Sequence, residues 1–503
     1  MNKKRLPKST YPNRYEIELD VDLDNFSYTG AQKVDLNVVE ATNNIVLNSV
    51  GIEVTKAKIQ TTKQDIPLEV NYIEEDEKIV FESQETLSEG VYELYLEFNS
   101  EITNDLKGFY KSSYMSEDGE KKWIATTQFE PTAARSAFPC WDEPEYKAIF
   151  SMTIITDEKY LRVSNEMVVE EEKVENNKLR TKFADSMKMS SYLVAFVIGD
   201  LEATVVGKSK TTDIRIIHRP GFSHQTSYAG TAAIKLLDFF EDYYKIPYPG
   251  TKLDLIAIPD FAMGAMENVG AVTFRENLLL FDKDKATRSE LDRSITVIAH
   301  ELAHMWFGDL VTMKWWDGIW LNEAFASLME VIASYNTYPE FKQWNAMNMS
   351  RTAGFSIDSL ENSRPVEFDV ETPDQAEEMF DVLTYEKGST VLRMFQMFIG
   401  EEAFQNGVEA YLNKFKFENT NSSDLWDALS EASNQPLNKI LPFWIREKGY
   451  PFLQVDCSNN FLTIKQKPFL LKNVETDKNN IKPVPVQIKF LDTGNEEKFL
   501  LDE

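Results

Sequence analysis

The sequence contains little histidine, little cysteine and no long hydrophobic run. Its two cysteines, Cys140 and Cys457, lie far apart in a chain of 503 residues, so a disulfide framework is not expected. No apolar stretch approaches the roughly 18 residues that a membrane-spanning helix needs. Residues 1–15 are basic and polar, whereas a secretory signal has an apolar core. These absences favour a cytoplasmic protein with no membrane partner.

Positive charge is also scarce. The chain has 53 Lys and Arg against 82 Asp and Glu, which gives a formal net charge of −29. Nucleic acids and anionic membranes repel such a surface, so we expect neither as a partner. An acidic protein suits a cationic ligand such as a peptide amine, although most of these charges are expected to be solvated surface. We expect the protein to act as a monomer.

The length of the chain predicts two to four domains, because one hydrophobic core does not support 503 residues. Apolar and acidic residues alternate from Tyr15 to Leu23 and in several later stretches, which is the period of half-buried strands. An antiparallel β domain is therefore predicted for residues 1–202. A mixture of strands and helices is predicted for 203–448, and strands return in 449–503.

Two of only four histidines, His300 and His304, lie four positions apart in a segment that predicts a buried helix. A Thr-x-x-Glu capping pattern begins at Thr287, and Gly308 offers a stop. Residues four apart share a helix face, so both imidazoles can bind one zinc ion. Glu301 beside them can take a proton from water. Satisfied core histidines are the alternative, which the scarcity of histidine disfavours.

A third zinc ligand is expected from the next apolar helix. Glu323 is the lone acid in the first half of that helix and follows His304 with eighteen residues between them. Two His and one Glu leave the fourth tetrahedral position open, which is typical of a catalytic site. A surface acid near a helix start is the alternative interpretation. The other histidines, His218 and His224, flank a Pro-Gly pair and are expected in loops.

A family resemblance rests on these residues and on a second motif upstream. The His-Glu-Leu-Ala-His motif with Glu323 at this spacing resembles the gluzincin metallopeptidases. The context 306–312 and the pair Trp315 and Trp316 are similar to the aminopeptidase N family, so the resemblance covers most of the chain. The second motif matches the signature of that family and consists of Gly264, Ala265, Met266, Glu267 and Asn268.

The resemblance implies a multidomain α+β fold. An N-terminal antiparallel β domain would precede a thermolysin-like α/β catalytic domain and the start of a small C-terminal β-sandwich. Family members with such a β module continue into a helical domain, so a shortened form is expected. The second motif is predicted to be an edge strand that lines the cleft, because small residues at Gly264 and Ala265 let a substrate backbone approach closely.

The resemblance also implies roles for individual side chains. Gln128 and Glu130 would reach the active site from the β domain. Tyr385 would direct its hydroxyl at the oxyanion, and a helix is predicted from 380 to 397 around it. Glu130, Glu267 and the outer oxygen of Glu323 would bind the free α-ammonium of a peptide, with the rest of the second motif beside them.

Side-chain preference is also implied only by the resemblance. Gln128, Met263 and Phe380 would line the first pocket, which favours neutral or hydrophobic N-terminal residues over acidic ones. Three other functions compete. A zinc endopeptidase would share the histidine motif without needing amine-binding acids. A catalytically idle peptide-binding protein and an epoxide hydrolase, an activity of one branch of the family, are the remaining alternatives.

The sequence therefore predicts a zinc-dependent aminopeptidase that hydrolyses the N-terminal peptide bond of peptides with a free amino terminus. One zinc ion per chain, held by His300, His304 and Glu323, would polarise the scissile carbonyl. Glu301 would deprotonate the attacking water and later protonate the leaving amine.

Overall fold

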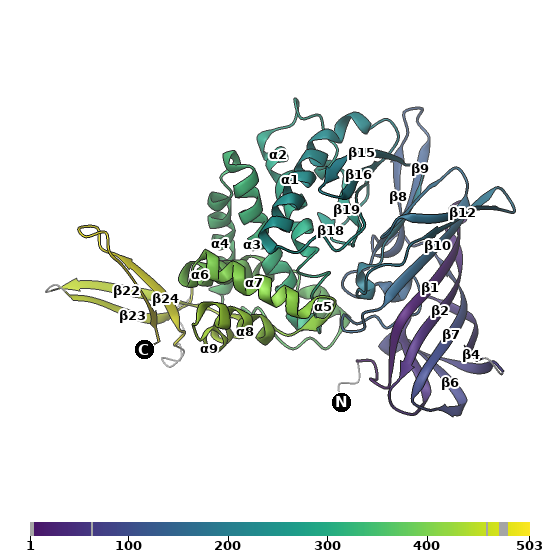
Figure 1. Cartoon of the computed structure of the whole chain (residues 1–503), viewed down its shortest axis with the longest axis horizontal. Helices are drawn as coiled ribbons and strands as arrows, with labels where there is room; N and C mark the ends of the chain where they lie inside the picture. The colour runs from purple at the N-terminus through teal and green to yellow at the C-terminus, as the bar shows by residue number, and fades with distance from the viewer. Residues whose placement is uncertain (1–4, 62–63, 459–460, 472–480, 503) are drawn as a thin grey trace.

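The computed structural model describes residues 5–61, 64–458, 461–471 and 481–502. The start of the basic N-terminal stretch and part of the predicted C-terminal strand region lie outside these residues. In Figure 1 a β-rich N-terminal part lies beside a helical middle part, and thin C-terminal strands extend from the far side of the helices. Among the described residues, no helix is long and apolar enough to cross a membrane.

The N-terminal part contains a sheet of ten strands. In sheet order they are β12 (Val168–Val174), β13 (Lys178–Phe183), β10 (Ile149–Asp157), β1 (Thr10–Asp22), β2 (Ser27–Val38), β7 (Gly90–Glu101), β4 (Glu53–Gln60), β5 (Ile66–Ile73), β6 (Lys78–Leu87) and β3 (Thr42–Asn48). The alternation that predicted the first strand is real, because Tyr15, Ile17 and Leu19 are buried between half-buried and exposed neighbours. The pairs are antiparallel except β1 with β10, which is parallel.

A second, smaller sheet carries the β-domain residues that face the middle part of the chain. Its strands, in sheet order, are β11 (Leu161–Ser164), β14 (Phe196–Gly199), β9 (Lys121–Gln128) and β8 (Gly108–Met115). Gln128 is the last residue of β9, and Glu130 follows in the loop. The end of a strand therefore holds these two side chains next to each other.

The middle part of the chain begins with a mixed sheet of five strands. Its order is β15 (Glu202–Ser209), β16 (Thr212–His218), β17 (Lys252–Ile258), β19 (Ala271–Arg275) and β18 (Ala265–Met266). Strands β16, β17 and β19 run parallel, and β18 pairs antiparallel with β19 at the edge. The prediction of an edge strand in the second motif is confirmed. The prediction for His218 is wrong, since it is the buried last residue of β16 and bonds the Thr204 hydroxyl at 2.8 Å.

Helices pack beside this sheet and continue into a helical bundle. They are α1 (Ser227–Tyr244), α2 (Arg288–His304), α3 (Trp320–Thr337), α4 (Gln343–Asp358), α5 (Pro373–Glu378), α6 (Gly388–Ile399), α7 (Glu401–Phe415), α8 (Ser422–Ser433) and α9 (Leu437–Ile445), with a short strand pair β20 (Thr312–Met313) and β21 (Asn419–Thr420). The capping box at Thr287 is present. Helix α2 ends at His304, four residues before the predicted stop, and Gly308 follows with φ of +135°.

The C-terminal strands form two separate hairpins. They are β22 (Tyr450–Ser458) with β23 (Phe461–Phe469), and β24 (Val484–Lys489) with β25 (Glu496–Leu501). Most of their residues are exposed or half-buried, and exposed apolar side chains include Phe452, Val455 and Phe461. This region is therefore strand, as predicted, but it has little buried core of its own.

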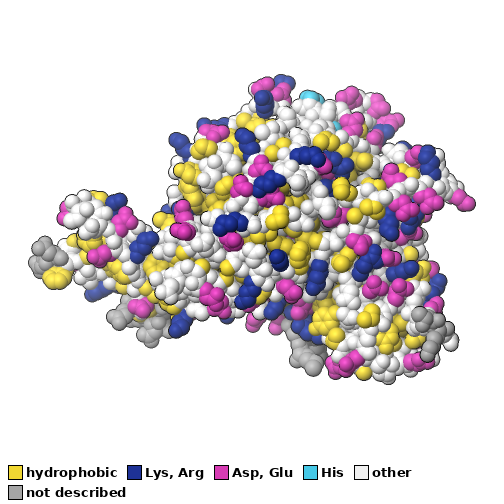
Figure 2. All heavy atoms as spheres, in the orientation of Figure 1, with side chains coloured by type: hydrophobic (Ala, Val, Ile, Leu, Met, Phe, Trp, Pro, Cys, Tyr) yellow, Lys and Arg dark blue, Asp and Glu magenta, His cyan; other side chains and the backbone are white. Residues whose placement is uncertain are grey.

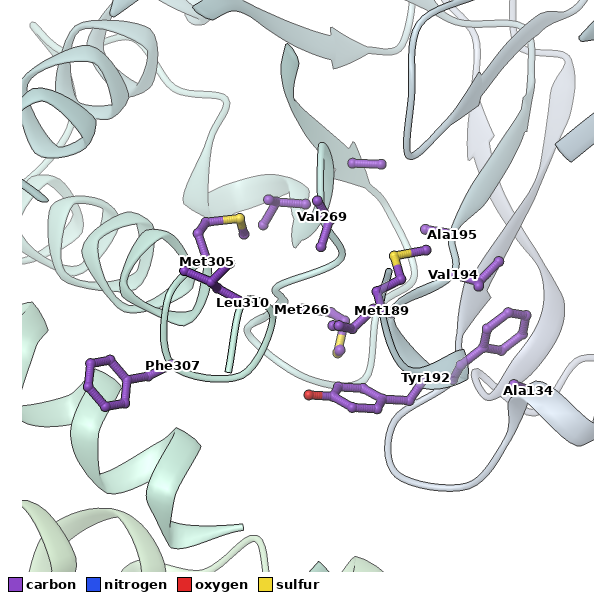
Figure 3. Close-up of a cluster of buried hydrophobic side chains, with 14 of the residues drawn as sticks. Ala134, Met189, Tyr192, Val194, Ala195, Met266, Val269, Met305, Phe307 and Leu310 are labelled. Carbon is purple, nitrogen blue, oxygen red and sulfur yellow. The ribbon is translucent and has the colours of Figure 1, made fainter. Parts of the chain in front are cut away.

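The β domain and the middle part of the chain share buried contacts. Figure 3 shows side chains from the β domain, including Met189 and Tyr192, next to Met266 of the second motif and residues that follow α2. The buried Lys147 ammonium also donates to the carbonyl oxygens of Asp309 and Leu310, at 3.0 and 3.2 Å. These contacts join the β domain, which carries Gln128 and Glu130, to the middle part of the chain.

Charged side chains are mixed over the outer surface. Figure 2 shows Asp and Glu spread across this face among Lys and Arg, without one dominant patch. Acids gather instead inside the molecule, where Glu130, Glu267, Glu301 and Glu323 are each at most 8% exposed. Because buried carboxylates need partners, this internal group of acids is a candidate functional site.

Candidate active site

The predicted zinc ligands converge on one point. The Nε2 atoms of His300 and His304 lie 3.3 and 3.4 Å from Oε2 of Glu323. Ligands about 2.0 Å from a tetrahedral zinc ion lie about 3.3 Å apart. Helices α2 and α3 therefore place one carboxylate and two imidazoles at the spacing that zinc requires.

The outer ring nitrogens fix the direction of both imidazoles. Nδ1 of His300 lies 2.8 Å from Oε2 of Glu330, and Nδ1 of His304 lies 2.9 Å from the carbonyl oxygen of Phe307. Acceptors at Nδ1 hold the proton there and leave Nε2 free to bind a metal. Sequence reasoning missed Glu330. Its signal was the spacing of seven residues from Glu323, which is two turns on one face of α3.

The electrostatics of the triad couple its three side chains. Burial opposes ionisation of Glu323, yet the two histidines hold its pKa at about 2. Burial also disfavours the charged form of His304, but Glu267 and Glu323 raise its pKa to about 10. A carboxylate that stays ionised between two imidazoles, in surroundings that favour positive charge, is a donor set suited to a divalent cation.

Glu301 lies on the face of α2 that carries His300 and His304, but its carboxyl forms no hydrogen bond with either imidazole among the described residues. Burial is the main cause that raises its pKa to about 8, with a further contribution from Glu267 and an opposing one from His300. A buried carboxyl that can hold or release a proton near neutral pH, beside a metal site, is suited to general acid and base chemistry.

The end of the cavity near His304 is crowded with acceptors that lack donors. One oxygen each of Glu130, Glu267 and Glu323 lie within 4.8 Å of one another. Oε1 of Gln128, Oε1 of Glu130 and Oε1 of Glu267 have no hydrogen-bond partner among the described residues. Burial raises the pKa of Glu130, and Glu267 raises it further. An ammonium group, with three donors and one positive charge, would satisfy all three atoms.

The second motif lines this part of the cavity. The cavity has a volume of about 380 Å³, and Met263, Gly264, Ala265, Met266 and Glu267 contribute to its wall. Gln128 donates its amide to the Met266 sulfur at 3.4 Å. Phe380 also lines the cavity and is half-buried, whereas Met263 is 41% exposed.

Asn268 is the one predicted substrate-binding residue that does not line the cavity. Its amide nitrogen lies 3.4 Å from the carbonyl oxygen of Ala271 and 3.3 Å from Oγ1 of Thr273. Alternation along an extended chain turns it to the other side from Glu267. Asn268 therefore supports the β18 to β19 connection and does not reach the cavity.

Tyr385 faces the metal ligands from a π-helical turn, η8 (Leu383–Lys387), which precedes α6. Its ring stacks on His300 with centroids 6.0 Å apart. Burial, and then Glu323, raise the pKa of the hydroxyl well above its usual value. The phenol therefore stays protonated and can donate a hydrogen bond. The predicted helix is present, but its first turn is wider than an α-helix, as is frequent at functional sites.

The opposite end of the cavity lies near His300. It is lined by Arg293 and Val297 of α2, Ser327 and Glu330 of α3, and Glu386 of the π-helical turn. Burial, and then Glu330, raise the pKa of Glu386, while a hydrogen bond with Ser350 and then the charges of His300 and Arg293 lower it. This end therefore contains a cation as well as acids, in contrast to the end near His304.

Comparison with known proteins identifies the family. The Peptidase family M1 domain matches residues 228–444, and the Peptidase M1 N-terminal domain matches residues 11–193. The chain belongs to peptidase family M1. Helices α2 and α3 and the second motif lie within the matched M1 domain, and Gln128 and Glu130 lie within the matched N-terminal domain.

Curated M1 relatives resemble nearly the whole chain. Aminopeptidase M1-A of Oryza sativa subsp. japonica is 39% identical over 509 residues, which cover 99% of this chain and 58% of the relative. Aminopeptidase M1 of Arabidopsis thaliana is 41% identical over 93% of this chain and 53% of its own length. Puromycin-sensitive aminopeptidase of Caenorhabditis elegans is 38% identical over 99% of this chain and 54% of its own length. The chain thus spans little more than half the length of these relatives.

Proposed function

We propose that this M1 chain is a zinc-dependent aminopeptidase that hydrolyses the N-terminal peptide bond of peptides. The observation that carries the proposal is the pairing of two features in one cavity. A His300, His304 and Glu323 triad has zinc spacing, and beside it Gln128 and Glu130, with Glu267, present acceptors that lack donors. The relatives are named aminopeptidases, which supports the same activity.

The chain's own residues account for binding and orientation. Glu130 and Glu267 would hold the α-ammonium of the substrate, because an ammonium satisfies both buried carboxylates. That anchor fixes which carbonyl reaches the histidines, so cleavage of the first bond follows from geometry. A bound zinc ion would supply Lewis acidity to the scissile carbonyl and the attacking water.

Proton transfer falls to Glu301 and Tyr385. Glu301 would take a proton from the attacking water and return it to the leaving amine. The Tyr385 hydroxyl, which stays protonated, would donate to the oxyanion of the tetrahedral intermediate. Both side chains line the same cavity as the triad.

The first side chain of the substrate would lie near Gln128, Met263 and Phe380. These residues line the cavity and carry no charge, so neutral or hydrophobic side chains are expected there. An acidic side chain would be repelled by Glu130 and Glu267. Action as a monomer in the cytoplasm remains an expectation that rests on composition alone.

A panel of aminoacyl chromogenic substrates, with and without a chelator, tests the proposal. We expect hydrolysis of alanyl and leucyl substrates, weak hydrolysis of glutamyl substrates, loss of activity with the chelator and recovery with zinc. Elemental analysis should find one zinc ion per chain. Absence of stoichiometric metal after zinc is supplied, or activity that the chelator does not change, would overturn the zinc assignment.

A further inference from the structure

One face of helix α2 lines the cavity along its length, and its five lining residues form a stripe. Arg293, Val297, His300, Glu301 and His304 all line it, at spacings of four, three, one and three residues. Those spacings put them on one face of the helix. A peptide anchored near one end of this stripe would therefore extend along these residues toward the other end.

The amine anchor lies at the His304 end of the stripe. Oε1 of Glu267 is 3.7 Å from Nδ1 of His304, whereas Glu330 bonds the ring of His300. A peptide whose ammonium lies at Glu267 and whose first carbonyl lies between the two histidines continues past His300. Its later residues then lie over Val297, in the direction of Arg293.

Arg293 is the lone Lys or Arg in the cavity wall, which contains six glutamates. It is exposed, and among the described residues its guanidinium takes part in no ion pair and donates no hydrogen bond. Its backbone carbonyl accepts a hydrogen bond from the Thr296 hydroxyl at 3.0 Å. Glu386 shares this end of the cavity but forms no ion pair with Arg293 within the described part of the chain. The guanidinium is therefore available to an anionic ligand.

The spacing selects the length of the ligand. Seven residues of α-helix separate Arg293 from His300, a rise of about 10 Å. An extended peptide advances about 3.4 Å per residue, so the carboxylate of a third residue lies about 7 Å beyond the first carbonyl. The arginine side chain can cover the remaining distance, and its planar guanidinium matches a carboxylate with two parallel hydrogen bonds.

We infer that Arg293 binds the C-terminal carboxylate of short peptides and makes tripeptides with a free C-terminus the preferred substrates of this cavity. The inference rests on the proposed aminopeptidase function and deepens it. Arg293 would act in binding only, since it lies two turns from the nearest zinc ligand. Amidation of the C-terminus should therefore raise KM and leave kcat nearly unchanged.

The test compares Leu-Gly-Gly with Leu-Gly-Gly-amide. For the zinc-loaded wild type we expect kcat/KM of the free acid to exceed that of the amide by about tenfold, as for one charge-assisted interaction. Arg293→Gln should lower kcat/KM of the free acid to the level of the amide, and Arg293→Lys should restore part of the difference. Arg288→Gln is the matched control, because Arg288 lies on the same helix outside the cavity and donates to the Glu340 carbonyl.

Equal kcat/KM for the free acid and the amide in the wild type, with both peptides cleaved, would overturn the inference and leave the proposed function standing. A difference that persists unchanged in Arg293→Gln would also overturn it. Calorimetric binding of the two peptides to the Glu301→Gln variant gives a readout that does not depend on turnover. Equal Kd values there would count against Arg293, whereas failure to cleave any free peptide would count against the aminopeptidase function.

Discussion

The two ends of the cavity handle their buried charges differently. Near His300, Glu330 bonds the imidazole, and half-buried Glu386 has a hydrogen bond with Ser350 that lowers its pKa. Near His304, Glu130 and Glu267 are almost fully buried and each retains an oxygen without a donor. A partnered carboxylate is part of the structure, but an unpartnered one costs stability unless a ligand completes it. The contrast supports the proposal that the α-ammonium binds at the end near His304.

The largest effect is expected at Glu301, which lies between the two ends. Glu301→Gln should reduce kcat by roughly 10²- to 10⁴-fold, the usual contribution of a positioned general base. Both ends keep their charges in this variant, so zinc content and the Kd of a tripeptide should stay close to the wild-type values. Metal analysis and calorimetry beside steady-state kinetics would show this. Near-normal turnover would remove Glu301 from the mechanism.

Removing a carboxylate charge should have different effects on catalysis at the two ends of the cavity. We expect Glu267→Gln to lower kcat/KM for free peptides by about 30- to 1000-fold, because the α-ammonium loses a buried carboxylate partner. Glu386→Gln is the matched control at the other end and should change kcat/KM by less than about threefold. Similar losses in the two variants would mean that the ends do not differ in function.

Glu330 should matter for the metal and not for the amine. Glu330→Gln weakens the acceptor that holds Nδ1 of His300, and such partners usually change metal affinity by about 10- to 100-fold. Competition with a zinc chelator of known affinity measures the change. Glu386→Gln again serves as the control, and an unchanged zinc affinity in Glu330→Gln would show that the bond does not orient the ligand.

The smallest effect concerns stability. Burial raises the pKa of Glu130 above its unfolded value of 4.5, so the metal-free fold binds this proton more tightly than the unfolded chain does. Stability from this group is present below pH 4.5 and is lost as pH rises toward the folded pKa. Glu130→Gln should therefore raise Tm of the metal-free protein by about 2–4 °C at pH 7, with little gain at pH 4. A fall in Tm at pH 7 would contradict this account.

Periodic and spaced patterns in the sequence predicted much of the architecture. The alternation from Tyr15 gave a strand of the large sheet, the capping box at Thr287 starts helix α2, and the eighteen-residue spacing brought Glu323 to the two histidines. Helical periodicity is local and strong here, so little tertiary information was needed. The second motif was placed on an edge strand by its small residues, and β18 lies at that edge.

Features that depend on tertiary contacts were missed or misplaced. Glu330 acts on His300 through a contact between helices α3 and α2. Its spacing from Glu323 is visible in the sequence, but spacing alone does not show that it faces His300. His218 belongs to a strand because β16 continues through it before the Pro-Gly turn. Asn268 turns away from the cavity because it follows Glu267 along an extended chain. Each of these depends on direction in space, which a linear motif does not fix.

Cleavage of a free peptide and its N-acetylated form by the zinc-loaded enzyme tests the central claim most directly. Acetylation removes the positive charge and leaves Glu130 and Glu267 unpaired, while the histidines and Glu301 are unaffected. We predict stepwise removal of residues from the free peptide and at least about 100-fold slower cleavage of the acetylated one. Comparable rates, or cleavage that begins at internal bonds, would contradict the assignment even if the zinc site is intact.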